Sequence, residues 1–247
     1  MVSRVFCRIP TVPRALPAAD EVHVWVAAVE SFRSEWAALQ TVLSPAESEA
    51  IAAYRQEADR DRRTAARGLL RHLLASYLAI APGDVELVVT LKGKPQLAPK
   101  HSGVGLEFNV SHSGDFVGLA FAVRRRVGID VEAVRPDAGG IELAESHFHP
   151  AEVEFLKTLE ADQQLPGFFQ FWTLKEAYLK ALGVGLEIPL RDFAVAWSPP
   201  EGPRLSWIRG DPAEPERWSA WVVDLPASHR GAVIAEGRGL RFVHGAR

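Results

Sequence analysis

The same order of predicted elements occurs twice along this chain of 247 residues: one strand, then helices, then several strands. The first series begins with an apolar run at Glu21–Val29, and the second begins with a shorter run at Val127–Val131. Apolar runs bounded by glycine, proline and serine are typical of strands. The repeated order predicts an α+β fold of two similar lobes, residues 1–123 and 124–247. The alternative is a single α+β domain with one mixed sheet.

Capping residues mark the predicted helices. Ser44, Pro45 and Glu47 have the spacing of an N-cap, an N1 proline and an N3 glutamate. The expected helices run from Ser44 to Leu78 with a break near Asp59, from His149 onward, and over Gly167–Leu182. The other expected strands are Val85–Leu91, Leu106–Val110, Phe116–Val123, Phe193–Trp197, Arg204–Ile208, Trp218–Val223 and Ala232–Glu236.

Composition restricts the class of protein. The 28 basic and 31 acidic side chains give a net charge of −3, which argues against a protein built mainly to bind nucleic acid. The single cysteine, Cys7, excludes an intramolecular disulfide and a zinc site of several cysteines. No apolar run approaches the ~18 residues of a membrane helix, and the N-terminus lacks the apolar core of a signal peptide. We therefore expect a cytoplasmic protein without a membrane segment.

The predicted helix Gly167–Leu182 carries a lysine on an apolar face. Positions three, four and seven residues from Lys175 share its face, because a helix repeats every 3.6 residues. All six of these neighbours are apolar or aromatic: Phe168, Phe171, Trp172, Tyr178, Leu179 and Leu182. An ammonium group there must either extend to solvent or meet an anion, since unpaired burial is costly. The simpler alternative is a surface pair of Glu176 and Lys180, with Lys175 reaching solvent.

Two carboxylates stand at i and i+2 in the strand that opens the second series. This spacing places Asp130 and Glu132 on one face of the strand. Oxygen ligands without nearby histidine or cysteine favour a hard cation such as Mg²⁺, which also binds substrate phosphates. With Glu176 as a third carboxylate and the lysines of its helix as phosphate partners, the residues are typical of a metal–pyrophosphate site. The alternative is an acidic pair at a solvated strand end.

Polar residues follow the expected strand Leu106–Val110. A hydrolase built on Ser111 and His112 is disfavoured, because adjacent residues do not readily form the geometry of a nucleophile and its base, and no G-x-S-x-G turn is present. We expect a loop whose hydroxyl, imidazole and main-chain N–H groups hold phosphate oxygens. The alternative is a polar turn with nothing bound.

Four stretches in this order resemble the Sfp-type 4′-phosphopantetheinyl transferases: Gly93–Pro95, Phe108–Ser113, Gly128–Glu132 and Phe171–Lys180. The resemblance implies two similar α+β lobes related by a pseudo-twofold axis, with coenzyme A in the cleft between them. It also implies transfer of the phosphopantetheine arm of coenzyme A to a serine of an apo acyl or peptidyl carrier protein, with release of 3′,5′-ADP.

The same resemblance implies roles for individual residues. The metal, Mg²⁺ or Mn²⁺, is assigned to Asp130, Glu132 and Glu176. The catalytic residues implied are Glu176, Lys175, Lys180 and His112. The lysines would neutralise phosphate charge, and Glu176 is also the candidate general base. The coenzyme contacts implied are Lys94, Ser111, His112, Lys175 and Lys180. Glu152 matches a further acidic position whose role is open.

The chain departs from this family after its Ser-Pro helix start. Relatives often carry lysines there that bind the 3′-phosphate, whereas this stretch is acidic and rich in alanine. We expect Arg62, with Arg55 or Arg67, to bind the 3′-phosphate instead. The alternative for Arg62 is a solvated helix arginine.

Two other functions remain open from the sequence. One is a catalytically silent module that binds coenzyme A, and the other is a Mg²⁺-dependent phosphoester hydrolase. The resemblance also implies a monomer, and we expect the chain to bind neither nucleic acid nor a membrane.

Overall fold

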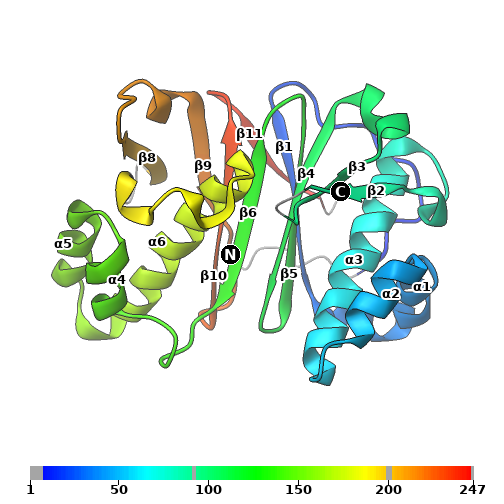
Figure 1. Ribbon diagram of the computed structural model, residues 1–247, viewed down its shortest axis with the longest axis horizontal. Coiled ribbons are helices and arrows are strands. Elements are labelled where there is room, and N and C mark those ends of the chain that lie inside the picture. The colour runs from blue at the N-terminus through cyan, green and yellow to red at the C-terminus, as the bar shows by residue number, and fades with distance from the viewer. Residues whose placement is uncertain (1–7, 91–92, 199–201, 246–247) are drawn as a thin grey trace. The chain divides into compact units, whose positions relative to one another are not determined.

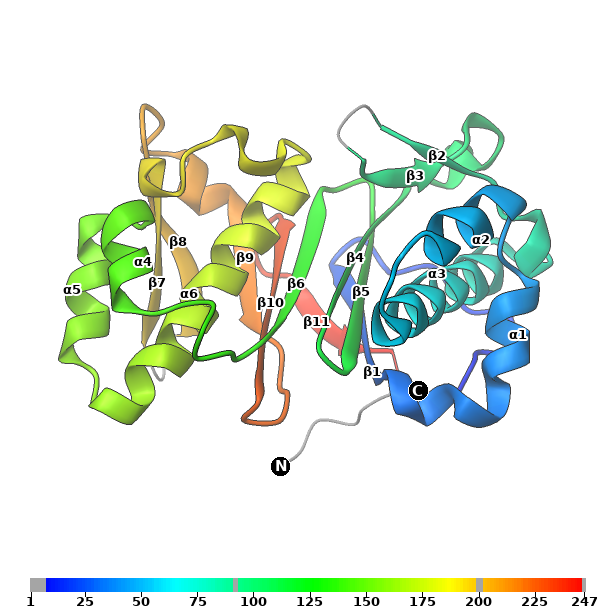
Figure 2. The same ribbon diagram turned by 60° about the horizontal axis from the view of Figure 1, so that its bottom comes forward.

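The computed structural model describes residues 8–90, 93–198 and 202–245, which form two compact units (Figures 1 and 2). The first unit holds residues 8–124 and 243–245, and the second holds residues 125–242. The end of the chain therefore differs from the division expected at 123/124, because the last strand joins the sheet of the first unit. Cys7 and Leu91 lie outside the described residues.

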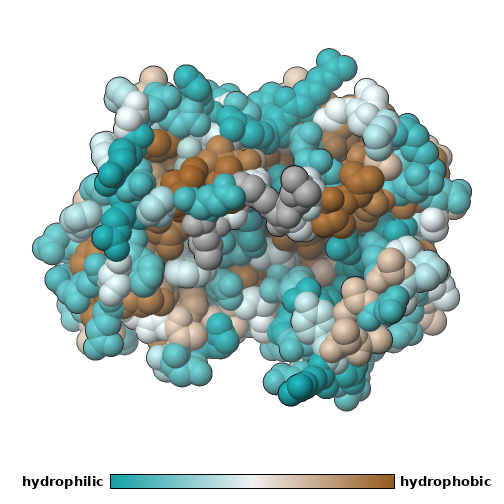
Figure 3. Space-filling model, viewed as in Figure 1, coloured by the Kyte–Doolittle hydropathy of each residue, from teal (hydrophilic) through white to brown (hydrophobic). Residues whose placement is uncertain are grey.

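The first unit combines an antiparallel sheet with helices. Its elements are β1 (Glu21–Ala28), α1 (Trp36–Thr41), α2 (Pro45–Ala52), α3 (Glu57–Leu78), β2 (Leu87–Val89), β3 (Pro95–Leu97), β4 (Leu106–Ser113) and β5 (Phe116–Val123). The sheet order is β11-β1-β5-β4, where β11 is the C-terminal strand Arg241–His244, and β2 pairs with β3. Val88 and Val89 of β2 are exposed. Figure 3 shows an apolar surface over the β2–β3 hairpin.

The second unit has the same kinds of element. They are β6 (Val127–Ala133), α4 (Ile141–His147), α5 (Pro150–Thr158), α6 (Ala161–Leu182), β7 (Phe193–Ser198), β8 (Gly202–Ile208), β9 (Trp218–Val222) and β10 (His229–Glu236). The sheet order is β6-β10-β9, and β7 pairs with β8. Short 3-10 helices lie at Val29–Glu35, Pro82–Asp84, Pro99–Val104, Gly185–Glu187, Leu190–Asp192 and Glu214–Arg217.

The two units repeat one topology. In each, one strand precedes three helices and four more strands, and the first strand lies beside the last: β1-β5-β4 in one sheet and β6-β10-β9 in the other. The predicted duplication of an α+β fold is therefore confirmed, and the single mixed sheet is wrong. No helix in the described part of the chain combines the length and the apolar character needed to cross a bilayer.

One long helix covers a sheet face in each unit (Figure 1). The leucines of α3 pack with Trp25 and Phe121 of the sheet in the first core. The aromatic face of α6 packs with Trp218 and Ile234 in the second core. Each helix thereby buries the apolar face that its period of 3.6 residues creates.

Several boundaries differ from expectation. The first helical stretch breaks at residues 53–56 instead of near Asp59. Helix α6 begins at Ala161 and includes Pro166, whose missing N–H lies in the second turn. The capping box at Ser44, Pro45 and Glu47 is confirmed.

Candidate active site

Strand β6 presents Asp130 and Glu132 on the side that faces α6. The strand's alternation puts both carboxylates on one face, and the residues between and before them are buried on the other. Gly128 shares the carboxylate face, where a Cβ would stand 2.0 Å from the carbonyl oxygen of Ala177 on α6. The missing side chain at Gly128 therefore allows α6 to lie directly on the strand that carries the carboxylates.

Helix α6 contributes Glu176 and Lys180, one turn apart. Lys180 Nζ donates to Asp130 Oδ1 at 2.6 Å, and the Asp130 side chain is only 3% exposed. Burial raises the pKa of Glu176 above its usual value; Asp130 and Glu132 raise it further, and Lys180 opposes them. The three predicted carboxylates and one predicted ammonium group therefore lie close enough to affect one another's charge.

The chemistry of this cluster fits a cation, although no complete metal site is assembled. Glu176 Oε1 is buried and accepts no hydrogen bond from the described residues, and an unsatisfied buried acceptor is costly. Among the described residues, however, no three acidic, histidine or cysteine side chains are arranged to hold a metal ion. Mg²⁺ usually takes one or two carboxylates together with water and substrate phosphates. The cluster therefore fits Mg²⁺ as a site that a phosphate ligand would complete.

Lys175 meets an anion inside the protein, one of the two outcomes that its apolar neighbours predicted. Its side chain is fully buried, and Nζ donates to Glu152 Oε1 and to the carbonyl oxygen of Phe193, both at 2.7 Å. Glu152 also accepts from the main-chain N–H groups of Val195 and His149. Burial lowers the pKa of Lys175 to about 8 and raises that of Glu152, while the ion pair opposes both shifts. The partners of the Lys175 ammonium group therefore lie inside the protein, which does not favour the expected contact with phosphate.

The segment after Val110, expected to be a loop, is instead the end of strand β4. Strand β4 continues to Ser113, and His112 pairs with Val117 of β5. Ser111 and His112 are consecutive strand residues, so their side chains project from opposite faces of the sheet. The two side chains therefore do not approach one phosphate from the same face.

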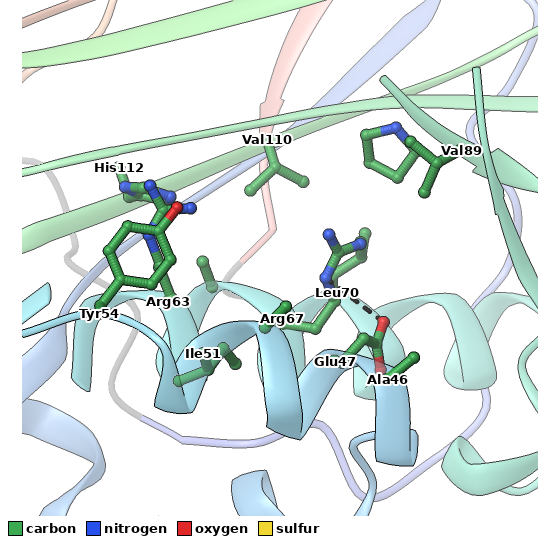
Figure 4. Close-up of a pocket in the computed structure, with 13 residues that line it drawn as sticks. Ala46, Glu47, Ile51, Tyr54, Arg63, Arg67, Leu70, Val89, Val110 and His112 are labelled. Atoms are coloured by element: carbon green, nitrogen blue, oxygen red, sulfur yellow. Dashed lines mark ion pairs between the residues drawn. The ribbon is translucent and has the colours of Figure 1, made fainter. Parts of the chain in front are cut away.

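A cavity of about 430 Å³ lies between α2, α3 and β4 in the first unit (Figure 4). Its polar lining includes Arg63 and Arg67 of α3, His112 of β4 and Glu47 of α2. Its other lining residues are Ala46, Ala50, Ile51, Tyr54, Ala66, Leu70, Val89, Pro95 and Val110. The cavity thus brings two guanidinium groups and an imidazole to one apolar hollow.

The two cavity arginines have different partners. The Arg63 guanidinium lies 3.9 Å from the centre of the Tyr54 ring, and Arg67 Nε lies 3.4 Å from Glu47 Oε1. Burial lowers the pKa of Arg67, and the Glu47 carboxylate opposes that shift. The Arg67 guanidinium is therefore partly desolvated beside a carboxylate.

Arg62 does not line this cavity. It donates to the carbonyl oxygen of Gly114 at 2.8 Å and forms an ion pair with Asp59. Arg67, one of the two alternatives expected, does line the cavity, whereas Arg55 does not. Sequence reasoning missed Arg63, although its spacing of four residues from Arg67 places both on one face of α3.

Lys94 is not among the described residues that line the cavity. The next residue, Pro95, lines the cavity. Burial raises the pKa of Glu107, and the positive charge of Lys94 opposes the shift, so the Lys94 ammonium group acts near Glu107.

Two models of one protein family match this chain. Residues 28–124 match a family model described as "4'-phosphopantetheinyl transferase, N-terminal". Residues 126–235 match another described as "4'-phosphopantetheinyl transferase superfamily". Each of the two units is therefore matched over most of its length.

Individual proteins show the same relationship. The 4'-phosphopantetheinyl transferase HetI of a Nostoc species is 36% identical over 197 residues, which span 80% of this chain and 83% of HetI. The human L-aminoadipate-semialdehyde dehydrogenase-phosphopantetheinyl transferase is 31% identical over 202 residues, 78% of this chain but only 64% of the human protein. The crystal structure of Thermotoga maritima holo-[acyl-carrier-protein] synthase matches 47% of this chain and 64% of that one, with 24% identity and a TM-score of 0.38. Because one relative matches over most of both chains and both units match models of one family, the chain belongs to the 4′-phosphopantetheinyl transferase superfamily.

Proposed function

We propose that this chain transfers the 4′-phosphopantetheine arm of coenzyme A to a serine of an apo acyl or peptidyl carrier protein. The serine oxygen forms a bond to the phosphorus that bears the pantetheine arm, and the bond from that phosphorus to the 5′-phosphate of 3′,5′-ADP breaks. The serine proton passes to a base. We further propose that the chain acts as a monomer in the cytoplasm. The observation that carries the proposal is the cluster of Asp130, Glu176 and Lys180 in a member of this family.

The second unit would bind the reacting pyrophosphate. Asp130, Glu132 and Glu176 would hold Mg²⁺, or Mn²⁺ in its place, and the bound metal would withdraw charge from the pyrophosphate oxygens. Lys180 would donate to a phosphate oxygen, since its side chain is 29% exposed and already reaches the carboxylate cluster. Glu176 would accept the serine proton, directly or through one water. Phosphoryl transfer depends mainly on such positioning and charge neutralisation.

The first unit would bind the nucleotide of coenzyme A. The cavity offers Arg63, Arg67 and His112 to phosphate oxygens and an apolar wall to the remainder of the ligand. Ser111 and Lys94 stay in the proposal as coenzyme contacts outside the cavity lining. Lys175 leaves it, because its ammonium group is held by Glu152.

A transfer assay tests the proposal. The full chain is incubated with coenzyme A, Mg²⁺ and an apo carrier protein, and the carrier is then weighed by mass spectrometry. We expect a gain of one phosphopantetheine arm. The Glu176→Gln variant should lower kcat by about 10²–10⁴-fold, the usual contribution of a positioned base, and chelation of divalent metal should abolish transfer. Glu154→Gln, which changes an exposed glutamate on α5, is the matched control and should retain full activity.

The same assay separates the two rival functions. Free phosphopantetheine without a change in carrier mass would indicate a hydrolase. Bound but unchanged coenzyme A would indicate a silent binding module. Full turnover by the Glu176→Gln variant would contradict the role assigned to Glu176.

A further inference from the structure

Glu47 introduces a negative charge into an otherwise basic cavity. It is the one acidic side chain among the described residues that line the hollow. Its carboxylate is 15% exposed and has partners on three sides: the main-chain N–H of Ser44 at 2.8 Å, Arg71 Nε at 2.7 Å and Arg67 Nε at 3.4 Å. Figure 4 shows its ion pair with Arg67 inside the cavity. The carboxylate is therefore fixed in place.

The two arginines that meet Glu47 are not equivalent. Arg71 is buried and also donates to the carbonyl oxygens of Val85 and Pro82, so it holds the end of α3 to the segment that follows. Arg67 lines the cavity and has a longer contact to Glu47. A phosphate that approaches Arg67 must therefore displace the carboxylate or lie beside its like charge. Either event weakens binding, and partial burial limits screening by solvent.

We infer that Glu47 is a specificity-determining residue that competes with the 3′-phosphate of coenzyme A for Arg67 and so limits the preference for coenzyme A over 3′-dephospho-coenzyme A. The inference rests on the proposed function, in which this cavity holds the nucleotide. Coenzyme A and 3′-dephospho-coenzyme A differ only by the 3′-phosphate. The ratio of their affinities therefore measures how much this phosphate contributes to binding.

The substitution Glu47→Gln tests this competition. A glutamine retains an oxygen that can accept from Ser44 N–H, so the capping box of α2 can persist. Removing the charge should raise the affinity for coenzyme A at least about tenfold, because two unit charges even about 10 Å apart interact by roughly that much at an effective dielectric constant of about 20. The affinity for 3′-dephospho-coenzyme A should change less than about twofold, since it lacks the phosphate that meets this charge. Isothermal titration calorimetry measures both affinities, and thermal unfolding checks the fold.

A second variant makes the test independent of the stability of the first. In Arg67→Gln the preference for coenzyme A over its dephospho form should fall, although Arg63 and His112 remain. In the double variant, Glu47→Gln should no longer raise the affinity for coenzyme A, because the Arg67 guanidinium for which Glu47 competes is absent. Glu86→Gln, which neutralises a carboxylate paired with Lys100 outside the cavity lining, is the matched control and should leave both affinities unchanged.

The outcomes distinguish this inference from the proposed function. If the unmodified chain binds both ligands but Glu47→Gln lowers the affinity for coenzyme A, or changes both affinities equally, competition by Glu47 is overturned and the proposed function stands. An undiminished preference in Arg67→Gln overturns the inference in the same way. If the unmodified chain binds neither ligand, the proposed function itself fails, and the inference fails with it.

Discussion

At the scale of single residues, the buried pair of Lys175 and Glu152 is expected to dominate the stability of the second unit. Both side chains are almost completely buried, and the carboxylate also accepts from two main-chain N–H groups. In Lys175→Met, Glu152 would keep its charge in the interior without its cation. Breaking a buried pair in this way costs about 3–5 kcal/mol. Urea denaturation should show a loss of that size in the free energy of unfolding.

An exposed pair provides the control for this prediction. Lys157 and Glu145 lie 2.8 Å apart with both side chains about half exposed. Surface pairs contribute about 0–1 kcal/mol, so Lys157→Met should be nearly neutral. A double variant, Lys175→Met with Glu152→Gln, should lose less free energy of unfolding than the two single variants lose together. No uncompensated charge is left in its interior. Equal small losses in all these variants would contradict the account.

The same pair shows what a single sequence can and cannot predict. The six apolar neighbours of Lys175 correctly indicated that its ammonium group either reaches solvent or meets an anion. The identity of that anion was not predictable, because Glu152 stands 23 residues earlier and its position at N3 of α5 already has a local explanation in the capping box. Arg62 and Arg63 present a similar limit: adjacent helix residues face different directions, and only the position of β4 decides which one lines the cavity.

At the scale of elements, the packing of α6 on β6 positions the carboxylate cluster. A Cβ at Gly128 would lie 2.0 Å from the carbonyl oxygen of Ala177 and 2.6 Å from the main-chain nitrogen of Ala181. Since both are backbone atoms, Gly128→Ala must push the helix from the strand. We expect a loss of about 1–3 kcal/mol or more in stability. Transfer activity should fall as well, because Asp130 and Lys180 lie on the two elements that separate.

A glycine with free space around it is the control for this substitution. A Cβ at Gly83 would meet no atom within 4 Å. Gly83→Ala should therefore leave both stability and transfer activity nearly unchanged, as surface substitutions usually do. An active, fully stable Gly128→Ala variant would show that close packing at this point does not position the cluster.

Elements were predictable where local chemistry decides them. Strand β5 has the predicted bounds, and the capping box at Ser44 forms as its spacing indicates. Strand β4 runs three residues beyond the expected end because its ladder with β5 continues through Ser111, His112 and Ser113. Those polar residues have no strand pattern of their own, so only the partner strand determines their conformation.

At the scale of the whole molecule, the sequence predicted the repeated order of elements but not the pairing of the C-terminal strand β11 with β1. The order of strand, helices and strands is visible as two similar series of apolar runs. The return of the last strand to the first sheet depends on a partner more than 200 residues away, at β1. Short runs such as Arg241–His244 carry no signal that identifies a distant partner.

The pairing of β11 with β1 makes the first unit depend on the last residues of the chain. Strand β11 lies at the edge of the sheet beside β1, the N–H of Gly245 donates to the carbonyl oxygen of Val24 at 2.8 Å, and Gly245 lies directly against the Trp25 ring. A chain that ends at Phe242 would lose these contacts and expose an edge of β1 to solvent. We expect faster amide hydrogen exchange in β1, since local opening costs less when an edge partner is missing. The contact of Phe242 with Trp221 would remain, so β6, β9 and β10 should keep their protection. Equal protection of β1 in the truncated and full chains, measured by mass spectrometry, would show that β11 adds nothing to the first sheet.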